Sequence, residues 1–580
     1  MLPECSHKTC EKRNPETGRC IQCENPVNVV LMWHMHQPQY ENLKDRSFVL
    51  PWTYLHCIKD YSDMAEAIHT SPGARAVVNF SATLLDQIVE YGRQLAAYFE
   101  EGTPLGDELL GALSKPLLTT DPAFRKRILQ QCLRAHKKNL ILRYPHFAEM
   151  ADIAAQAIKS EAKAAYLKEQ FFFDLLVWYH LAWMGETIKR SNSDCQYLIA
   201  KQKNYTADDR QTLLQLIAEV INDIIPSYRR LWEEGRIELT FTPENHPIIP
   251  LLLDFSKARE SIPDAPLPGG SYPGGRVRSE AQISKGIEIF EEHFGHKPVG
   301  CWPAEGALCE QTLELLRDQD IRWAASGAGV LHNSLNASKE PEGCIHHSYQ
   351  FGERDIRCFF RDDNLSDLIG FTFHDWNPED AVNHMIHHIE NIQSACNFQP
   401  DTIVPIILDG ENCWEYYPGN GYAFLQALYK KLGNHHRIKL TTFGEYLDQE
   451  HKPHLLSTLV AGSWVNGNLA TWIGDKDKNL GWELLVRAKQ AYDQVLGTLP
   501  VEQQLVAEKQ LSICESSDWF WWFGDYNAAD SVSDFDRLYR EHLKNLYHSL
   551  GLHTPDTLET EISVGHGNPE MDGTMRRGGA

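Results

Sequence analysis

The sequence lacks any long hydrophobic run. No stretch of about 18 apolar residues, the length that a membrane-spanning helix needs, occurs in the chain. The longest candidate, FFFDLLVWYHLAWMG (171–185), is interrupted by Asp174 and His180, so we expect a buried helix there. The first residues, MLPECSHKTCEKRN, also lack the apolar segment of a signal peptide. We therefore expect a protein that has no membrane partner.

Positive charge is scarce as well. The 580 residues include 55 Lys and Arg against 79 Asp and Glu, which leaves a net charge of −24. This balance opposes binding to nucleic acid and suits a neutral partner. Hydrophobic residues at 42% and aromatic residues at 10% are enough for a sizeable core, and the length exceeds what one core usually serves. The composition predicts a large globular protein with additions to a main domain.

Closely spaced cysteines are lacking over most of the chain. Most of the 14 cysteines stand singly in apolar segments, as reduced thiols do, so we expect a cytoplasmic location. The exception is CSHKTCEKRNPETGRCIQC, with the spacings C-x4-C and C-x2-C between Cys5, Cys10, Cys20 and Cys23. These thiols could hold a structural zinc ion, or the segment could be an unstructured arm. Neither interpretation makes it the catalytic site, and we expect no cofactor for catalysis.

Short β-branched or aromatic runs recur along the chain with helical segments between them. There are seven: 27–38, 75–82, 237–246, 297–306, 321–327, 356–363 and 402–412. Strands that alternate with helices form a parallel sheet, and a barrel hides every edge of such a sheet. Chemistry in a barrel collects where the strands end. Those ends carry polar residues, namely His36, Glu244, His246, Glu305, Asp362 and Asp409.

The pattern divides the chain into four parts. Residues 1–25 form the cysteine-rich arm, and residues 26–447 form the barrel. The barrel contains a helical insertion at about 84–234, which is rich in Ala, Leu, Glu and Lys with helical apolar spacing. Residues 448–552 are helical again. Residues 553–580 end in GHGNPEMDGTMRRGGA, for which we expect a flexible tail.

Two carboxylates stand out at strand ends. Glu305 lies in GCWPAEGALCE between small residues that leave room for a substrate, and Asp409 ends the run IILDGENCWE. Either acid alone is more often a helix cap or a partner of Arg, but two acids on one rim can face each other across a substrate. Glycoside cleavage needs such a pair. We interpret Glu411 as a supporting acid or hydroxyl ligand and Glu415 as the start of the next helix.

Tryptophans near these strand ends favour a carbohydrate. Sugar rings stack on indole through their C–H faces, while Asn, Asp, Glu and His bind the hydroxyls. Each tryptophan singly is more often a core residue, but together with the acids they indicate a sugar substrate. The residues are Trp33, Trp52, Trp302, Trp376, Trp414, Trp464 and Trp472.

Five ordered motifs resemble glycoside hydrolase family 57. They are His36-Gln37-Pro38, GRIELTFTPENHPIIPLL (235–252), CWPAEGAL (301–308), LDGENCWE (408–415) and SWVNGNLATWIGDKDKNLGWELL (463–485). Within the family, VWYHLAWMG, FRDDNLSDLIGF and SSDWFWWFGD are similar to the branch labelled α-amylase/α-mannosidase. The resemblance implies an incomplete (β/α)7 TIM-like barrel with a helical C-terminal region. It also implies a retaining enzyme that acts on α-glucans, such as an α-amylase or amylopullulanase.

The resemblance also implies roles for single residues. Glu305 takes the place of the catalytic nucleophile and Asp409 that of the general acid/base. We expect the substrate to contact further residues around them: His36, Gln37, His246, Trp302, Asp362, Glu411, Trp414 and Trp464.

Three alternatives stay open at this point. A 4-α-glucanotransferase or branching enzyme would use the same two acids. His34 and His36 lie on one face of a strand and could bind a metal, as in an α-mannosidase or polysaccharide deacetylase, although Met35 and Gln37 supply no acidic ligand. A non-catalytic glucan-binding protein is the third, and the presence of both acids argues against it.

Overall fold

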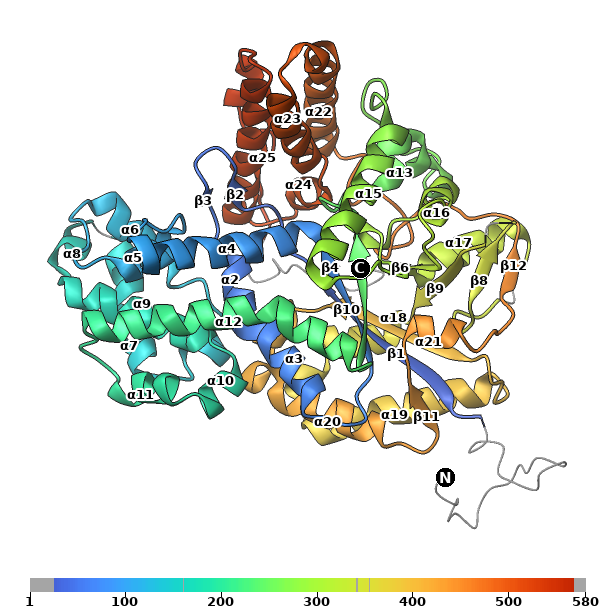
Figure 1. Cartoon of the computed structure of the whole chain (residues 1–580), viewed down its shortest axis with the longest axis horizontal. Helices are drawn as coiled ribbons and strands as arrows, with labels where there is room; N and C mark the ends of the chain where they lie inside the picture. The colour runs from blue at the N-terminus through green and yellow to red at the C-terminus, as the bar shows by residue number, and fades with distance from the viewer. Residues whose placement is uncertain (1–24, 160, 341–342, 354, 568–580) are drawn as a thin grey trace.

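The computed structural model describes residues 25–159, 161–340, 343–353 and 355–567 (Figure 1). The four cysteines of the predicted zinc-binding arm lie outside these residues. Among the described helices, none combines the length and the apolar character that crossing a bilayer requires.

Seven parallel strands form the centre of the molecule, and each lies within one of the seven predicted runs. In spatial order they follow the path β10, β1, β4, β5, β6, β7, β9. Their bounds are β1 (Val27–Met35), β4 (Ala76–Ser81), β5 (Ile237–Thr242), β6 (Gly300–Cys301), β7 (Trp323–Gly327), β9 (Arg357–Arg361) and β10 (Ile403–Asp409). Nearly all of their residues are buried, because packed side chains fill the inner face of the sheet and helices or loops cover the outer face. The predicted barrel with seven strands is confirmed.

The barrel is well paired on one side of β10 and open on the other. Strand β10 pairs with β1 from Asn28 opposite Ile403 to His34 opposite Asp409. Towards β9, by contrast, the described strands form no ladder, and the main chains meet through Asp362 N, which donates to Pro405 O at 2.8 Å. The sheet instead continues from β9 to β8 (Tyr349–Phe351) and β12 (His454–Leu456). The barrel is therefore incomplete between β9 and β10.

Apolar side chains fill the barrel interior. Helix α21 (Phe443–Leu447) closes the end at which the strands begin, where Phe443 stacks on Phe359 with ring centroids 4.4 Å apart. The buried carboxylate of Glu238 accepts hydrogen bonds from Trp323 Nε1 and Gly444 N at this end. The interior cluster consists of Val30, Met32, Val77, Trp302, Trp323, Ala325, Phe359, Ile403, Ile407, Phe443 and Tyr446.

Helices surround the strands. Strand β11 (Ile438–Leu440) adds to β1 at the strand-start end. The covering helices are α2 (Trp52–His56), α3 (Ser62–His69), α13 (Ile249–Leu253), α15 (Gly275–Phe294), α16 (Glu310–Arg317), α17 (Ala328–Ser338), α18 (Asp363–Phe371), α19 (Pro378–Ala395) and α20 (Tyr422–Gly433).

A helical insertion lies to one side of the barrel (Figure 1). It runs from α4 (Ala82–Glu101) through α5 (Glu108–Ser114), α6 (Pro122–Gln131), α7 (Pro145–Ile158), α9 (Glu169–Trp183), α10 (Glu186–Ser191) and α11 (Ser193–Lys201) to α12 (Ala207–Glu233). Helix α9 is the predicted buried helix. Its Asp174 accepts hydrogen bonds from the backbone N–H groups of Asn204 and Tyr205, and His180 lies 3.0 Å from the Tyr54 hydroxyl.

The C-terminal helices cover the barrel at the end where the strands finish. They are α22 (Lys476–Val495), α23 (Val501–Cys514), α24 (Ser517–Trp522) and α25 (Ala529–Ser549), drawn in red-brown at the top of Figure 1. Trp482 and Phe520 stack in their core with centroids 4.2 Å apart. Although the sequence predicts a flexible tail from residue 553, residues 553–567 pack here, because Leu558 is buried and Ile562 N donates to Asp536 Oδ1.

Candidate active site

A cavity of about 620 Å³ lies where the barrel strands end. The barrel, the insertion and the C-terminal helices all contribute to its walls, with Trp52, Leu133, His136, Trp183, Trp521, Trp522 and Phe535 among the lining residues. Seven of the ten predicted catalytic and substrate-binding residues line it: His36, Gln37, His246, Glu305, Asp409, Glu411 and Trp464. The strand-end placement thus brings most of the predicted site together.

Glu305 lies in a tight turn directly after β6. Its backbone has φ of 58°, a left-handed conformation that a non-glycine residue rarely adopts and that costs about 1–3 kcal/mol. Trp464 holds the turn at two points: its backbone N–H donates to Glu305 O at 3.1 Å, and its indole Nε1–H donates to Glu305 Oε2 at 2.9 Å. The Glu305 side chain is 13% exposed and faces the cavity. These two contacts hold the strained turn and fix the Glu305 carboxylate at the rim.

Asp409 is the last residue of β10 and lies opposite His34. Burial raises the pKa of Asp409 to about 6, although a hydrogen bond from Asn412 Nδ2 to Oδ2 at 2.8 Å and the charges of His36 and Arg361 favour its ionised form. A carboxylic acid with this pKa keeps its proton at mildly acidic pH and can donate it.

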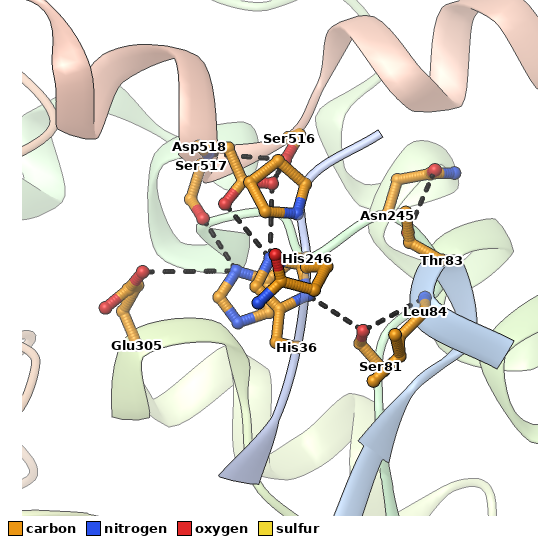
Figure 2. Close-up of polar contacts among 12 residues, drawn as sticks. His36, Ser81, Thr83, Leu84, Asn245, His246, Glu305, Ser516, Ser517 and Asp518 are labelled. Atoms are coloured by element: carbon orange, nitrogen blue, oxygen red, sulfur yellow. Dashed lines mark hydrogen bonds and ion pairs between the residues drawn. The ribbon is translucent and has the colours of Figure 1, made fainter. Parts of the chain in front are cut away.

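Three histidines, His34, His36 and His246, form a stack. Figure 2 shows His36 and His246 beside Glu305. The rings of His36 and His246 lie parallel with centroids 3.7 Å apart, and His34 Nε2 is 3.1 Å from His246 Nε2. His246 Nδ1 also lies 2.8 Å from Ser517 Oγ and 4.0 Å from Glu305 Oε1. Burial lowers the pKa of His246 well below its ordinary value and that of His34 to about 3. Both imidazoles are therefore neutral and act through hydrogen bonds.

The C-terminal helices contribute an acid that sequence reasoning missed. Asp518 in α24 accepts a hydrogen bond from His36 Nε2 at 3.0 Å, while His36 Nδ1 lies 2.8 Å from Ser81 Oγ (Figure 2). The Ser516 hydroxyl donates to the other oxygen of Asp518 at 2.6 Å. The only local signal is the run SSD before the aromatic residues WFWWF.

Glu411 is buried next to Asp409. Its Oε1 accepts hydrogen bonds from Gln37 Nε2 at 2.9 Å, the Tyr61 hydroxyl at 3.0 Å and His36 N at 3.2 Å. Its Oε2 has no hydrogen-bond partner among the described residues. Burial and the neighbouring Asp409 raise the pKa of Glu411 well above its ordinary value. Glu415 also lines the cavity.

Three predicted site residues lie behind the cavity, and the lining traced through the described residues does not include them. Trp302 is fully buried in the barrel and packs edge-on against Trp464 at 5.2 Å. Trp414 is buried, and its Nε1–H donates to Gly410 O at 2.7 Å. Asp362 caps α18 through Leu365 N and accepts a hydrogen bond from His346 Nε2.

Within the part of the chain that the structure describes, His36, His246 and Asp518 come close enough to share a metal ion. Both ring nitrogens of each histidine already lie within hydrogen-bond distance of a neighbour: Ser81 and Asp518 for His36, Ser517 and His34 for His246. A metal would therefore have to replace this network. Two other such groups lie outside the cavity lining: Cys344, His346 and Cys396, and His347, Asp401 and His454.

One family profile matches the sequence of the chain, and solved structures match its fold. The family profile described as glycosyl hydrolase family 57 matches residues 30–459. Among curated proteins, none matches the chain significantly.

Solved structures share the fold at low identity. A family 57 branching enzyme from Pyrococcus horikoshii superposes with a TM-score of 0.55 at 14% identity, over 96% of this chain and 100% of that chain. One from Thermococcus kodakaraensis gives 0.52 at 14% identity, over 90% and 88%. The α-amylase AmyC from Thermotoga maritima gives 0.53 at 13% identity, over 92% and 96%.

Proposed function

The chain belongs to glycosyl hydrolase family 57, and on this premise we propose that it is a retaining glycosidase of α-1,4-glucans with Glu305 as nucleophile and Asp409 as general acid/base. One observation carries the proposal. Two carboxylates from different strand ends line one cavity, and burial raises the pKa of one of them, Asp409, to about 6. A carboxyl group with a raised pKa can serve as the proton donor of such a pair.

The reaction has two steps. In the first, a Glu305 oxygen forms a bond to the anomeric carbon while the glycosidic C–O bond breaks, and Asp409 gives its proton to the leaving oxygen. In the second, water or a sugar hydroxyl attacks the anomeric carbon, Asp409 takes the proton, and the bond to Glu305 breaks. Configuration is retained because each step inverts it once.

The histidine stack and Glu411 line the cavity together with the two acids and are proposed to contact the sugar at the cleaved bond. His36 and His246 are held in position by Asp518 and Ser517. Aromatic side chains of the cavity wall, such as Trp521 and Trp522, offer faces on which further glucose units can stack.

Transfer to an acceptor sugar is the second candidate activity. The insertion supplies Trp183 and His136 to the wall, and α25 supplies Phe535. A ring and a polar group of this kind can hold an acceptor where water would otherwise attack. The likeness in fold to two branching enzymes supports the same candidate.

Product analysis tests the proposal. We expect the purified chain to shorten maltooligosaccharides and amylose, to release the α-anomer first, and to lose this activity in Glu305→Gln. Growth of longer oligosaccharides would identify a transferase with the same machinery, and cleavage of pullulan would add α-1,6 bonds. Initial release of the β-anomer, or full activity of Glu305→Gln, would contradict the assignment.

A further inference from the structure

A second cluster of reactive side chains lies at the incomplete side of the barrel, outside the cavity. The loop of residues 343–348 runs beside the start of β10 there, where His346 O accepts a hydrogen bond from Ile403 N at 3.0 Å. Cys344 and His346 belong to this loop, and Cys396 directly follows α19. The loop thus lies where β9 and β10 fail to pair.

The ligand atoms of the three side chains converge. One atom each from Cys344, His346 and Cys396 lie within 4.8 Å of one another. The Cys344 Sγ is 3.4 Å from His346 Nδ1. All three residues are partly exposed, so an ion can reach them from solvent. Both cysteines are free thiols.

A carboxylate holds the histidine in place from behind. His346 Nε2 donates to Asp362 Oδ2 at 2.9 Å, which leaves Nδ1 directed at Cys344. Asp362 is itself fixed, since its Oδ1 accepts from Leu365 N and its own N–H donates to Pro405 O. Histidines that bind metals are oriented by a carboxylate on the other ring nitrogen in this way.

We propose that Cys344, His346 and Cys396 bind one zinc ion, with Asp362 as the residue that positions His346. Two sulfur ligands and one imidazole are a donor set that zinc prefers, and the fourth position of its tetrahedron is left for water. Zinc binds cysteine as the thiolate, so binding releases the protons of both thiols to solvent.

The ion would link two segments that no strand pairing connects. It ties the loop of residues 343–348 to the end of α19, across the start of β10. We therefore expect zinc to stabilise this side of the barrel and to raise the melting temperature. The proposal is independent of the glycosidase assignment, because the site shares no lining residue with the cavity.

The test uses the full chain with Cys5, Cys10, Cys20 and Cys23 changed to Ser, so that the N-terminal segment cannot bind the ion. After reduction, equilibration with Zn²⁺ and removal of the excess, we expect one zinc ion per chain by elemental analysis. Cys344→Ser combined with Cys396→Ser should remove it. Zinc that persists in this double variant would overturn the proposal. So would a failure of the test chain that retains Cys344 and Cys396 to take up zinc.

Neighbouring histidines provide a matched pair of variants. His346→Gln should lose the zinc, whereas His347→Gln should keep it, because His347 packs on His454 with ring centroids 4.3 Å apart instead. The opposite result would assign the ion to His347, Asp401 and His454 and refute the site. Asp362→Asn should bind zinc about 10- to 100-fold more weakly, as the loss of an orienting carboxylate does.

Thiol protection keeps the test decisive if a variant fails to fold. In the chain that retains Cys344 and Cys396, Zn²⁺ should slow their alkylation by iodoacetamide, as mapped on peptides, and Mg²⁺ should not. Equal alkylation with and without Zn²⁺ would overturn the proposal. A Cys344–Cys396 disulfide in the protein as purified, together with no zinc uptake once that protein is reduced, would also overturn the proposal.

Discussion

The two proposed catalytic carboxylates have opposite surroundings. Glu305 sits on a strained turn, and the indole N–H of Trp464 donates to it from outside the barrel strands. Asp409 ends a strand that pairs with β1 along its whole length, and burial raises its pKa to about 6. Under the proposed assignment, the donor aimed at Glu305 and the pKa raised by burial at Asp409 are the features that distinguish the attacking carboxylate from the proton donor.

Removing the attacking carboxylate is the most severe way to break this comparison. We expect Glu305→Ala to lower kcat on maltooligosaccharides by about 10⁴-fold or more, because no covalent intermediate can form. Azide should then restore turnover of an activated α-glucosyl substrate and yield the β-glucosyl azide, detected by NMR. Formation of the α-azide would contradict the role of Glu305.

Removing the proton donor should have a smaller and more selective effect. Asp409→Asn should lower kcat on maltooligosaccharides by about 10²- to 10⁴-fold. The first step should stay fast for α-glucosyl fluoride, because fluoride leaves without a proton. Azide should here give the α-azide, since it attacks the intermediate from the opposite face. An equal loss on both substrates would show that Asp409 is not the acid.

Weakening the contact to Glu305 sharpens the comparison. Trp464→Phe keeps the ring and the backbone hydrogen bond but removes the indole N–H. A hydrogen bond to a charged group is worth about 1.5–3 kcal/mol, so kcat/KM should fall about 10- to 100-fold. Trp376→Phe is the control, because Trp376 is exposed and lies outside the cavity lining. An equal effect in both variants would point to general destabilisation.

The smallest effect is expected at Asn412. Its amide stabilises the ionised form of Asp409 and so lowers the pKa of that acid. Asn412→Ala should therefore raise the pKa, and the alkaline limb of kcat/KM against pH should move upward from about 6. Activity above this limb rises because more Asp409 keeps its proton. A shift to lower pH would contradict the proposed role of Asp409.

Local patterns in the sequence predict the barrel well. Short apolar runs mark all seven strands, even β6, of which only Gly300 and Cys301 are paired. They also predict that Glu305 and Asp409 meet, because parallel strands end at one rim. Both lie in the cavity lining.

Other parts of the site depend on side-chain direction and on distant contacts. Trp302 and Trp414 lie close in sequence to Glu305 and Glu411, but both side chains are buried. Closeness in sequence does not reveal the direction in which a side chain points. Asp518 reaches His36 across 482 positions of sequence, so no spacing rule connects them. Asn79 and Ser81, which hold His34 and His36, alternate along β4 and are the partners that a closer reading of strand ends could find.

The hydrogen bond from His36 to Asp518 has a consequence for how such proteins can be recombined. The cavity does not belong to the barrel alone, because Asp518 in α24 contacts His36 and Trp464 contacts Glu305, the proposed nucleophile. A barrel transplanted without residues 463–549 would keep both acids but lose the contact from Trp464 to Glu305 and the contact from Asp518 to His36. In a chimeric protein, the barrel and the C-terminal region therefore have to come from the same parent chain.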